Sequence, residues 1–348
     1  MSLVRTEGSV NSMHEARLWT SGGDGTVRCN LCSFRCSIAD GKRGICGVRE
    51  NRGGTLYSIN YGRLIAQNID PIEKKPLYHF QPGSSSYSIA TVGCNFRCLH
   101  CQNYNISQMP RVSRKIMGDE VSPDEVVRSA KEAGCRSIAY TYTEPTIFFE
   151  YARDCAVLAK EEGIRNVFVT NGYMTKECLD ELSGILDAAN VDVKSFSEEF
   201  YRKVCGARLA PVLESIEYML KLGIWVEVTT LVIPRHNDSE EELREIARWI
   251  SRTEKSMPWH ISAFYPAYKM MNVPRTPASI IDRAREIGLE EGLRYVYTGN
   301  VPGDPGESTY CYACKRILIE RLGFGIKANH IEDSRCPYCG AEIDGIEL

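Results

Sequence analysis

The stretch Gly93-Cys94-Asn95-Phe96-Arg97-Cys98-Leu99-His100-Cys101-Gln102-Asn103 places three cysteines within eight residues. Closely spaced thiolates bind an iron–sulfur cluster or zinc, because one loop brings several soft ligands to a single centre. Four protein ligands would close such a site, whereas three leave a position for a substrate or cofactor. The sequence therefore predicts an open metal site at Cys94, Cys98 and Cys101. A zinc loop completed by His100 or by a distant cysteine is the alternative.

Around this loop, short β-rich runs alternate with helical segments from residue 86 onward. The strand candidates are Ser88–Val92, Ser137–Thr141, Asn166–Thr170, Val191–Val193, Trp225–Leu231, Ile261–Phe264 and Tyr295–Tyr297. Helices are predicted to begin at the capping box Ser122-Pro123-Asp124-Glu125 and at Asp238-Ser239, and to occupy 147–162, 175–187, 211–222 and 277–291. Gly163, Gly223 and Gly292 stand where helix C-caps belong. This alternation predicts a parallel sheet in a partial (β/α)6-type barrel, whose chemistry lies at the carboxyl ends of the strands.

Eleven of the fifteen cysteines fall into three clusters, of which the Cys94 loop is the central one. The C-terminal cluster, Cys311, Cys314, Cys336 and Cys339, has the paired spacing of a zinc ribbon, with an iron site as the alternative. The N-terminal cluster is Cys29, Cys32, Cys36 and Cys46. It also predicts a closed four-thiolate site, for which zinc is slightly favoured over an auxiliary iron–sulfur cluster.

The composition is that of an ordinary globular enzyme, with 43% hydrophobic residues, 25% charged residues and a net charge of −3. This charge disfavours binding to nucleic acid or to anionic membrane. The sequence shows neither a bilayer-spanning apolar run nor a secretory pattern, and metal-type cysteine pairs favour a reducing cytoplasm. We expect a leader at 1–20, a metal-binding segment and connector at 21–85, the barrel at 86–300 and a zinc-ribbon-like segment at 301–348.

The Cys94-x3-Cys98-x2-Cys101 spacing after the first barrel strand resembles the defining motif of the radical S-adenosylmethionine (SAM) superfamily. The resemblance implies that these cysteines bind a [4Fe–4S] cluster whose fourth iron is chelated by SAM. Reductive cleavage of SAM would then yield a 5′-deoxyadenosyl radical, with the cofactor supplying the chemistry and the protein supplying position and shielding. The residue before the third cysteine is usually aromatic in this superfamily. Here it is His100, whose flat ring still offers support to adenine.

Further SAM contacts are implied at the later strand ends. Glu144, with Thr143 before it, matches a Gly-Gly-Glu-Pro-like segment that lacks both glycines. The structural alternative is that Glu144 caps a helix. Asn171 ends strand three, while Asp192 and Lys194 end strand four, where a structural ion pair is an equally good interpretation. Thr230, in strand five, lies in a region that contacts the adenosyl group in the pyruvate formate-lyase activating enzyme branch.

From about Met13 the chain resembles the radical SAM enzyme of the AmmeMemoRadiSam system, which is related to pyruvate formate-lyase activating enzymes. The supporting stretches are the N-terminal cysteines, Tyr61-Gly62-Arg63, Asp70–Phe80, Tyr140–Ile147, Tyr297–Val301 and the C-terminal cysteine pairs. The resemblance implies hydrogen abstraction from an unidentified substrate, with a protein as one option, and an electron donor such as flavodoxin or ferredoxin. Glycyl-radical-enzyme activation is a narrower alternative. A zinc-bearing adaptor or nucleic-acid-binding protein with an inactive barrel is the alternative from another class.

Overall fold

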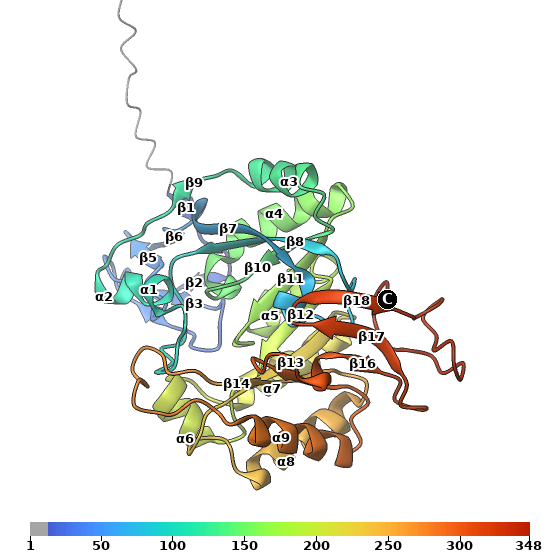
Figure 1. Cartoon of the computed structure of the whole chain (residues 1–348). Helices are drawn as coiled ribbons and strands as arrows, with labels where there is room; N and C mark the ends of the chain where they lie inside the picture. Colours follow the sequence, from blue (N-terminus) through green and yellow to red (C-terminus); the bar gives the residue numbers. More distant parts are fainter. Residues whose placement is uncertain (1–12) are drawn as a thin grey trace, which may run out of the picture.

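The computed structural model describes residues 13–348, and a nine-stranded sheet runs through its centre (Figure 1). Seven of the strands are parallel, and β7 and β9 extend the sheet in antiparallel pairing at one side. In spatial order the strands are β15 (Val296–Gly299), β14 (Trp259–Ala263), β13 (Trp225–Val232), β12 (Ala188–Asp192), β11 (Arg165–Thr170), β10 (Ser137–Tyr140), β8 (Ser85–Thr91), β7 (Arg63–Pro71) and β9 (Asp119–Glu120). The expected partial barrel is confirmed, and all seven predicted strands take part in its parallel sheet.

Helices join the parallel strands and cover the outer face of the sheet (Figure 1). They are α1 (Tyr104–Ser107), α2 (Met109–Val112), α3 (Pro123–Glu132), α4 (Phe149–Glu161), α5 (Lys176–Asp180), α6 (Glu198–Phe200), α7 (Ala210–Lys221), α8 (Glu240–Glu254) and α9 (Ala278–Glu290). Short 3₁₀ turns occupy Ile72–Lys74, Pro145–Phe148 and Pro305–Glu307, and a π-helical turn occupies Tyr201–Cys205. None of the helices within residues 13–348 is long and apolar enough to cross a membrane.

The predicted helix boundaries are largely confirmed. Ser122 caps α3 in a reciprocal capping box with Glu125, and Ser239 caps α8. The segment predicted to be helical over 175–187 is an exception, because α5 ends at Asp180. Beyond it the backbone turns through i→i+3 hydrogen bonds, and Gly184 adopts a left-handed φ of 69°, which a continuing helix does not allow.

Two small antiparallel sheets precede the barrel. One contains β1 (His14–Glu15), β6 (Thr55–Ser58) and β5 (Arg49–Arg52), and the other contains β2 (Trp19–Ser21), β3 (Val27–Cys29) and β4 (Ser37–Ile38). Most of the predicted leader, residues 1–12, lies outside the described residues, whereas residues 14–20 contribute to β1 and β2 and so belong to this N-terminal unit. The central sheet likewise begins before residue 86, because β7 pairs with β8.

The C-terminal segment folds as a three-stranded antiparallel sheet of β16 (Thr309–Tyr310), β17 (Ile317–Leu322) and β18 (Gly325–Asn329). It packs on the barrel through a second apolar cluster that includes Tyr78, Tyr295, Tyr297, Cys311 and Ile343. The chain after β18 returns to the barrel, where Ile346 bridges to Phe80. The connector that follows β7 is therefore held between the barrel and the C-terminal segment.

Candidate active site

A cavity of about 970 Å³ opens at the carboxyl ends of the parallel strands. It is lined from β8 through β15 by residues within these strands and just after them, as expected where parallel strands end at one edge. The structure brings together nine of the ten residues that the sequence predicted for this site. They are Cys94, Cys98, His100, Cys101, Thr143, Glu144, Asn171, Asp192 and Lys194.

The cysteine loop is held by hydrogen bonds to its backbone and to its sulfurs. The amide of Phe96 donates to Cys94 Sγ at 3.3 Å, and Cys101 Sγ lies 3.2 Å from the hydroxyl oxygen of Ser107. The amides of Arg97 and Leu99 donate to carbonyls of the π-helical turn at 3.0 Å each. These contacts fix the path of the loop, so that all three thiols face one cavity.

Arg111 anchors the start of the same loop. Its guanidinium donates to three successive carbonyl oxygens, those of Cys94 and Asn95 at 2.9 Å each and that of Phe96 at 2.8 Å. Its Nε donates in addition to the carbonyl oxygen of Ile45 at 2.7 Å. The planar fork of arginine matches several fixed acceptors at once, and here it joins the cysteine loop to the N-terminal unit.

Cys205, one of the four cysteines outside the three clusters, lies against Cys98. Its thiol is in hydrogen-bonding contact with that of Cys98, and this contact lowers the pKa of Cys98. Cys205 belongs to the π-helical turn 201–205, more than 100 residues along the chain from the motif. No local spacing pattern could have revealed the contact.

Glu144 is 1% exposed, and its carboxylate joins two strand ends. Oε1 accepts from Thr146 N, Thr146 Oγ1 and Thr170 Oγ1, at 3.1, 2.5 and 2.6 Å. Oε2 accepts from Asn171 N at 2.8 Å. Burial raises the pKa of Glu144 even though these donors favour the charged form. The carboxylate thus caps the 3₁₀ turn after β10 and also lines the cavity.

A cation and an unpaired imidazole nitrogen stand near the thiols. Lys194 Nζ lies 2.8 Å from Asp192 Oδ2. Burial opposes the charge on Lys194, but Asp192 and the thiol of Cys98 raise its pKa above the ordinary value. His100 is 4% exposed, and burial with nearby Lys194 lowers its pKa to about 3. Its Nδ1 is buried without a hydrogen-bond partner, and the neutral ring lines the cavity.

Thr230 lies away from the cavity. Its hydroxyl donates to Val193 O at 2.8 Å and accepts from Trp259 Nε1 at 2.9 Å, within the core. Its neighbours Thr229 and Leu231 line the cavity instead. Successive residues of a strand face opposite sides, so a displacement of one position moves a side chain from the site into the core.

A second charged group at the rim was missed by sequence reasoning. Lys75 is 1% exposed and its Nζ lies 2.6 Å from Asp70 Oδ2, while the hydroxyl of Tyr142 donates to the same carboxylate. Burial lowers the pKa of Lys75 to about 8 despite this ion pair. Tyr142 has a left-handed φ of 60°, and its carbonyl accepts from Asn103 of the cysteine loop. The sequence placed this segment in the connector and assigned no role to Lys75.

The C-terminal cysteines form a compact group beside the barrel. Cys311 Sγ lies 3.6 Å from Cys339 Sγ, and Cys314 Sγ lies 3.7 Å from Cys336 Sγ. All four ligand atoms lie within 4.8 Å of one another. Four sulfurs bound to one tetrahedral ion at about 2.3 Å stand about 3.8 Å apart, so this spacing suits a single ion.

The fold and the three-thiol cavity define a radical SAM enzyme, and the chain belongs to the radical SAM superfamily, whose model matches residues 88–250. An uncharacterized protein of Methanocaldococcus jannaschii is 47% identical over 335 residues, covering 95% of this chain and 99% of that protein. The pyruvate formate-lyase 1-activating enzyme of Escherichia coli K12 is 25% identical over 175 residues, covering 48% of this chain and 71% of that enzyme.

A solved structure resembles the fold. Streptococcus suis SuiB bound to S-adenosylmethionine matches with a TM-score of 0.50 at 12% identity, over 65% of this chain and 52% of SuiB. Membership of the superfamily implies a [4Fe–4S] cluster and SAM. The residues present fit both groups, because three cysteines and the neutral ring of His100 line one cavity.

Proposed function

We propose that this enzyme reductively cleaves SAM and directs the resulting 5′-deoxyadenosyl radical to a hydrogen atom of a bound substrate. Cys94, Cys98 and Cys101 bind the cluster in this proposal. The observation that carries it is the convergence of three thiols with side chains from three further strand ends on one cavity. Three thiolates leave the open coordination position that a chelating cofactor requires.

The surrounding side chains hold and shield the cofactor. The Asp192–Lys194 pair places a positive charge close to Cys98, where it offsets the negative charge of thiolates and of a carboxylate. Glu144 is in reach of an ammonium group but already accepts four hydrogen bonds, so we assign it mainly to fixing the strand ends. His100 lines the cavity with a neutral ring suited to stacking against a nucleobase.

The substrate is proposed to enter from the side opposite the cysteine loop. The cavity extends there to the β17–β18 turn, where Leu322 and Phe324 are exposed to solvent by 55% and 50%. Exposed apolar side chains at a rim favour a substrate larger than a metabolite, such as a protein segment. Likeness to a pyruvate formate-lyase activating enzyme supports a protein substrate, and activation of a glycyl-radical enzyme is the narrower form of this proposal.

For the C-terminal cysteine group we propose that Cys311, Cys314, Cys336 and Cys339 bind zinc. The short sulfur–sulfur distances support a single tetrahedral ion at this group. Metal analysis of the anaerobically purified chain checks this, with one zinc expected per chain and its loss expected in Cys336→Ser. Zinc that remains in this variant would contradict the assignment.

The test of the main proposal is reconstitution with iron and sulfide without oxygen, followed by addition of dithionite and SAM. We expect 5′-deoxyadenosine from the wild type and none from Cys98→Ala, whereas Cys135→Ala, altered at a buried cysteine outside all three clusters, retains product formation. A wild type that binds zinc but no iron would instead support the adaptor with an inactive barrel. Undiminished product from Cys98→Ala would contradict the ligand assignment.

A further inference from the structure

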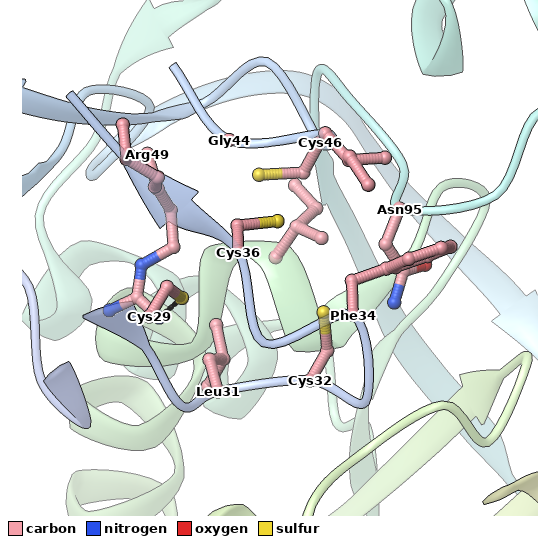
Figure 2. Close-up of a pocket in the computed structure, with 12 residues that line it drawn as sticks. Cys29, Leu31, Cys32, Phe34, Cys36, Gly44, Cys46, Arg49 and Asn95 are labelled. Atoms are coloured by element: carbon pink, nitrogen blue, oxygen red, sulfur yellow. Dashed lines mark hydrogen bonds between the residues drawn. The ribbon is translucent and has the colours of Figure 1, made fainter. Parts of the chain in front are cut away.

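The four N-terminal cysteines surround one small space beneath the cysteine loop of the barrel. Cys29 ends β3, and the other three lie on the chain between β3 and β5. Figure 2 shows the sulfurs of Cys32, Cys36 and Cys46 directed toward this space, with Cys29 beside the side chain of Arg49. Cys29, Cys32 and Cys46 are each at most 9% exposed. A group of four thiols around a common space, three of them on buried residues, has the ligand set of a closed metal site.

The C-terminal group shows the sulfur spacing that a single ion requires. Its four ligand atoms lie within 4.8 Å of one another, and sulfurs around one tetrahedral ion stand about 3.8 Å apart. In a [4Fe–4S] cluster each thiolate binds a different iron, and the cluster sulfurs accept hydrogen bonds from the surrounding protein. The donors around the N-terminal space therefore decide between a polynuclear cluster and the single zinc ion that the sequence had slightly favoured.

The wall of the space supplies unpaired donors. Arg49 is 1% exposed, and its Nη1 donates to Cys29 Sγ at 3.3 Å while its Nη2 pairs with Glu150 at 2.6 Å. Arg49 Nε and Asn95 Nδ2 are buried without a hydrogen-bond partner, and both residues line the space. Buried polar groups are normally satisfied, and the thiolate and sulfide sulfurs of a cluster are acceptors for such donors.

The N-terminal space and the active-site loop share a wall. Arg111 donates to the carbonyl before Cys46 and also to the carbonyl of Cys94. A Cβ atom placed on Gly93 would stand 3.4 Å from the carbonyl oxygen of Cys46. Asn95 lines the N-terminal space, and its Oδ1 accepts from Asn171 of the active-site cavity at 2.7 Å. The two thiol groups are thus separated by directly packed backbone.

We propose that Cys29, Cys32, Cys36 and Cys46 bind a second [4Fe–4S] cluster, which passes electrons to the cluster at Cys94, Cys98 and Cys101. The site itself stands on the four thiols around one space and on the unpaired donors, and only the transfer step rests on the proposed SAM chemistry. In that step a low-potential protein donor of the flavodoxin or ferredoxin class gives one electron to the N-terminal cluster. The N-terminal cluster is reoxidised as the active-site cluster is reduced by one electron, and no proton is transferred.

Iron counting tests the site without any need for activity. After anaerobic reconstitution we expect about eight iron atoms per wild-type chain, four for each [4Fe–4S] cluster. The triple variant Cys94→Ala, Cys98→Ala, Cys101→Ala should keep about four, with the Mössbauer signature of a [4Fe–4S] cluster. Adding Cys32→Ser and Cys36→Ser to the triple variant should remove them. Cys178→Ser, a buried cysteine outside the three clusters, is the matched control and should retain the wild-type count.

Two results would overturn the site. The first is a triple variant without iron that carries two zinc ions per chain. The second is iron in the triple variant that is lost on Cys311→Ser and not on Cys36→Ser. If the serine variants fail to fold, Arg49→Gln keeps all four thiols and should shift the reduction potential and EPR spectrum of the iron that remains in the triple variant, because one N–H···S contact is removed. An unchanged spectrum would contradict the assignment.

The transfer step is tested by comparing two reductants. The ratio of the rate with a reduced flavodoxin-type donor to the rate with dithionite should fall in Cys36→Ser and should be unchanged in Cys178→Ser. An unchanged ratio in Cys36→Ser would overturn the transfer. A wild type that binds eight irons yet forms no 5′-deoxyadenosine would contradict the proposed function and leave the second cluster standing. If the wild type forms 5′-deoxyadenosine but the triple variant binds no iron, the second cluster would be contradicted and the proposed function would stand.

Discussion

The carboxylate of Glu144 accepts hydrogen bonds from donors after β10 and from donors at the end of β11, so its charge is committed to the fold before any ligand arrives. Both interpretations that the sequence left open, capping and cavity lining, hold for the same side chain. Such double use is common at strand ends, because a site built there needs its loops fixed by the residues that line it.

The variant Glu144→Gln measures how much the hydrogen bonds of Glu144 contribute to the stability of the fold. The amide retains one oxygen but turns its NH₂ group toward existing donors, so at least one buried donor loses its acceptor. We expect a loss of about 1–3 kcal/mol in the free energy of unfolding. Denaturant titration of the apoprotein measures this, with the exposed Glu161→Gln as a control of the same chemistry. Equal stability of the two variants would show that the network contributes little.

At the residue scale, resemblance to known motifs located the site well but misjudged side-chain direction once. Thr230 was selected by its place in the sequence, whereas the cavity is lined by its neighbours Thr229 and Leu231. Lys75 and Cys205 were beyond reach for a different reason. Lys75 lies in the stretch Asp70–Phe80, which supported the resemblance without assigning any residue a role, and Cys205 is brought to Cys98 by tertiary packing of the π-helical turn.

At the scale of elements, the turn from β8 into the cysteine loop depends on Gly93. Its φ is +111°, and a Cβ atom there would lie 2.8 Å from Val48 Cγ1 and 3.3 Å from Ile147 Cδ1. Gly223, after α7, has a φ of +75° but open space around the same position. Substitution by alanine would therefore strain the backbone at both glycines, but it would create steric overlap only at Gly93.

We expect Gly223→Ala to lower the free energy of unfolding by about 1–2 kcal/mol through backbone strain alone. Gly93→Ala should lose about 1–3 kcal/mol more through overpacking. It should also retain less iron, because the loop that carries Cys94 must shift. Denaturant titration and iron analysis after identical reconstitution check both expectations. Equal losses of unfolding free energy in the two variants would contradict the overpacking at Gly93, because Val48 and Ile147 would then move aside at no energetic cost.

The sequence was informative about elements wherever the local pattern was strong. All seven parallel strands and the caps of α3 and α8 were predicted, since buried β-rich runs and capping boxes are local signals. The strands of the N-terminal unit span two to four residues each, too short for a periodicity to show.

At the scale of the whole molecule, His79 joins three parts of the chain. It lies in the connector after β7, and its Nδ1 donates to the carbonyl oxygen of Asp344 at 2.6 Å. Its Nε2 lies 2.5 Å from the hydroxyl of Tyr297 in β15, which then donates to it. These two contacts fit the neutral ring with its proton on Nδ1. Burial lowers the pKa of His79 to about 4.

This pKa sets a direction for acid sensitivity. Between about pH 6.5 and pH 4 the unfolded chain protonates His79 and the folded chain does not, so stability is lost as the pH falls. The expected slope is about 1.4 kcal/mol per pH unit from this group. His79→Gln should flatten the dependence measured by denaturant titration from pH 7 to pH 5, whereas exposed His330→Gln should not. Parallel profiles for the wild type and His79→Gln would contradict this account.

The contact between Cys98 and Cys205 bears on how the enzyme must be assembled. Before iron arrives, the pair is a dithiol within one buried wall, and oxygen or any disulfide oxidant can consume the ligand thiol by joining it to its neighbour. Once Cys98 holds iron, that thiolate is no longer free to attack. Cluster assembly and disulfide formation therefore compete for the thiol of Cys98. A reductant added before iron and sulfide keeps this thiol reduced, so that it can bind iron.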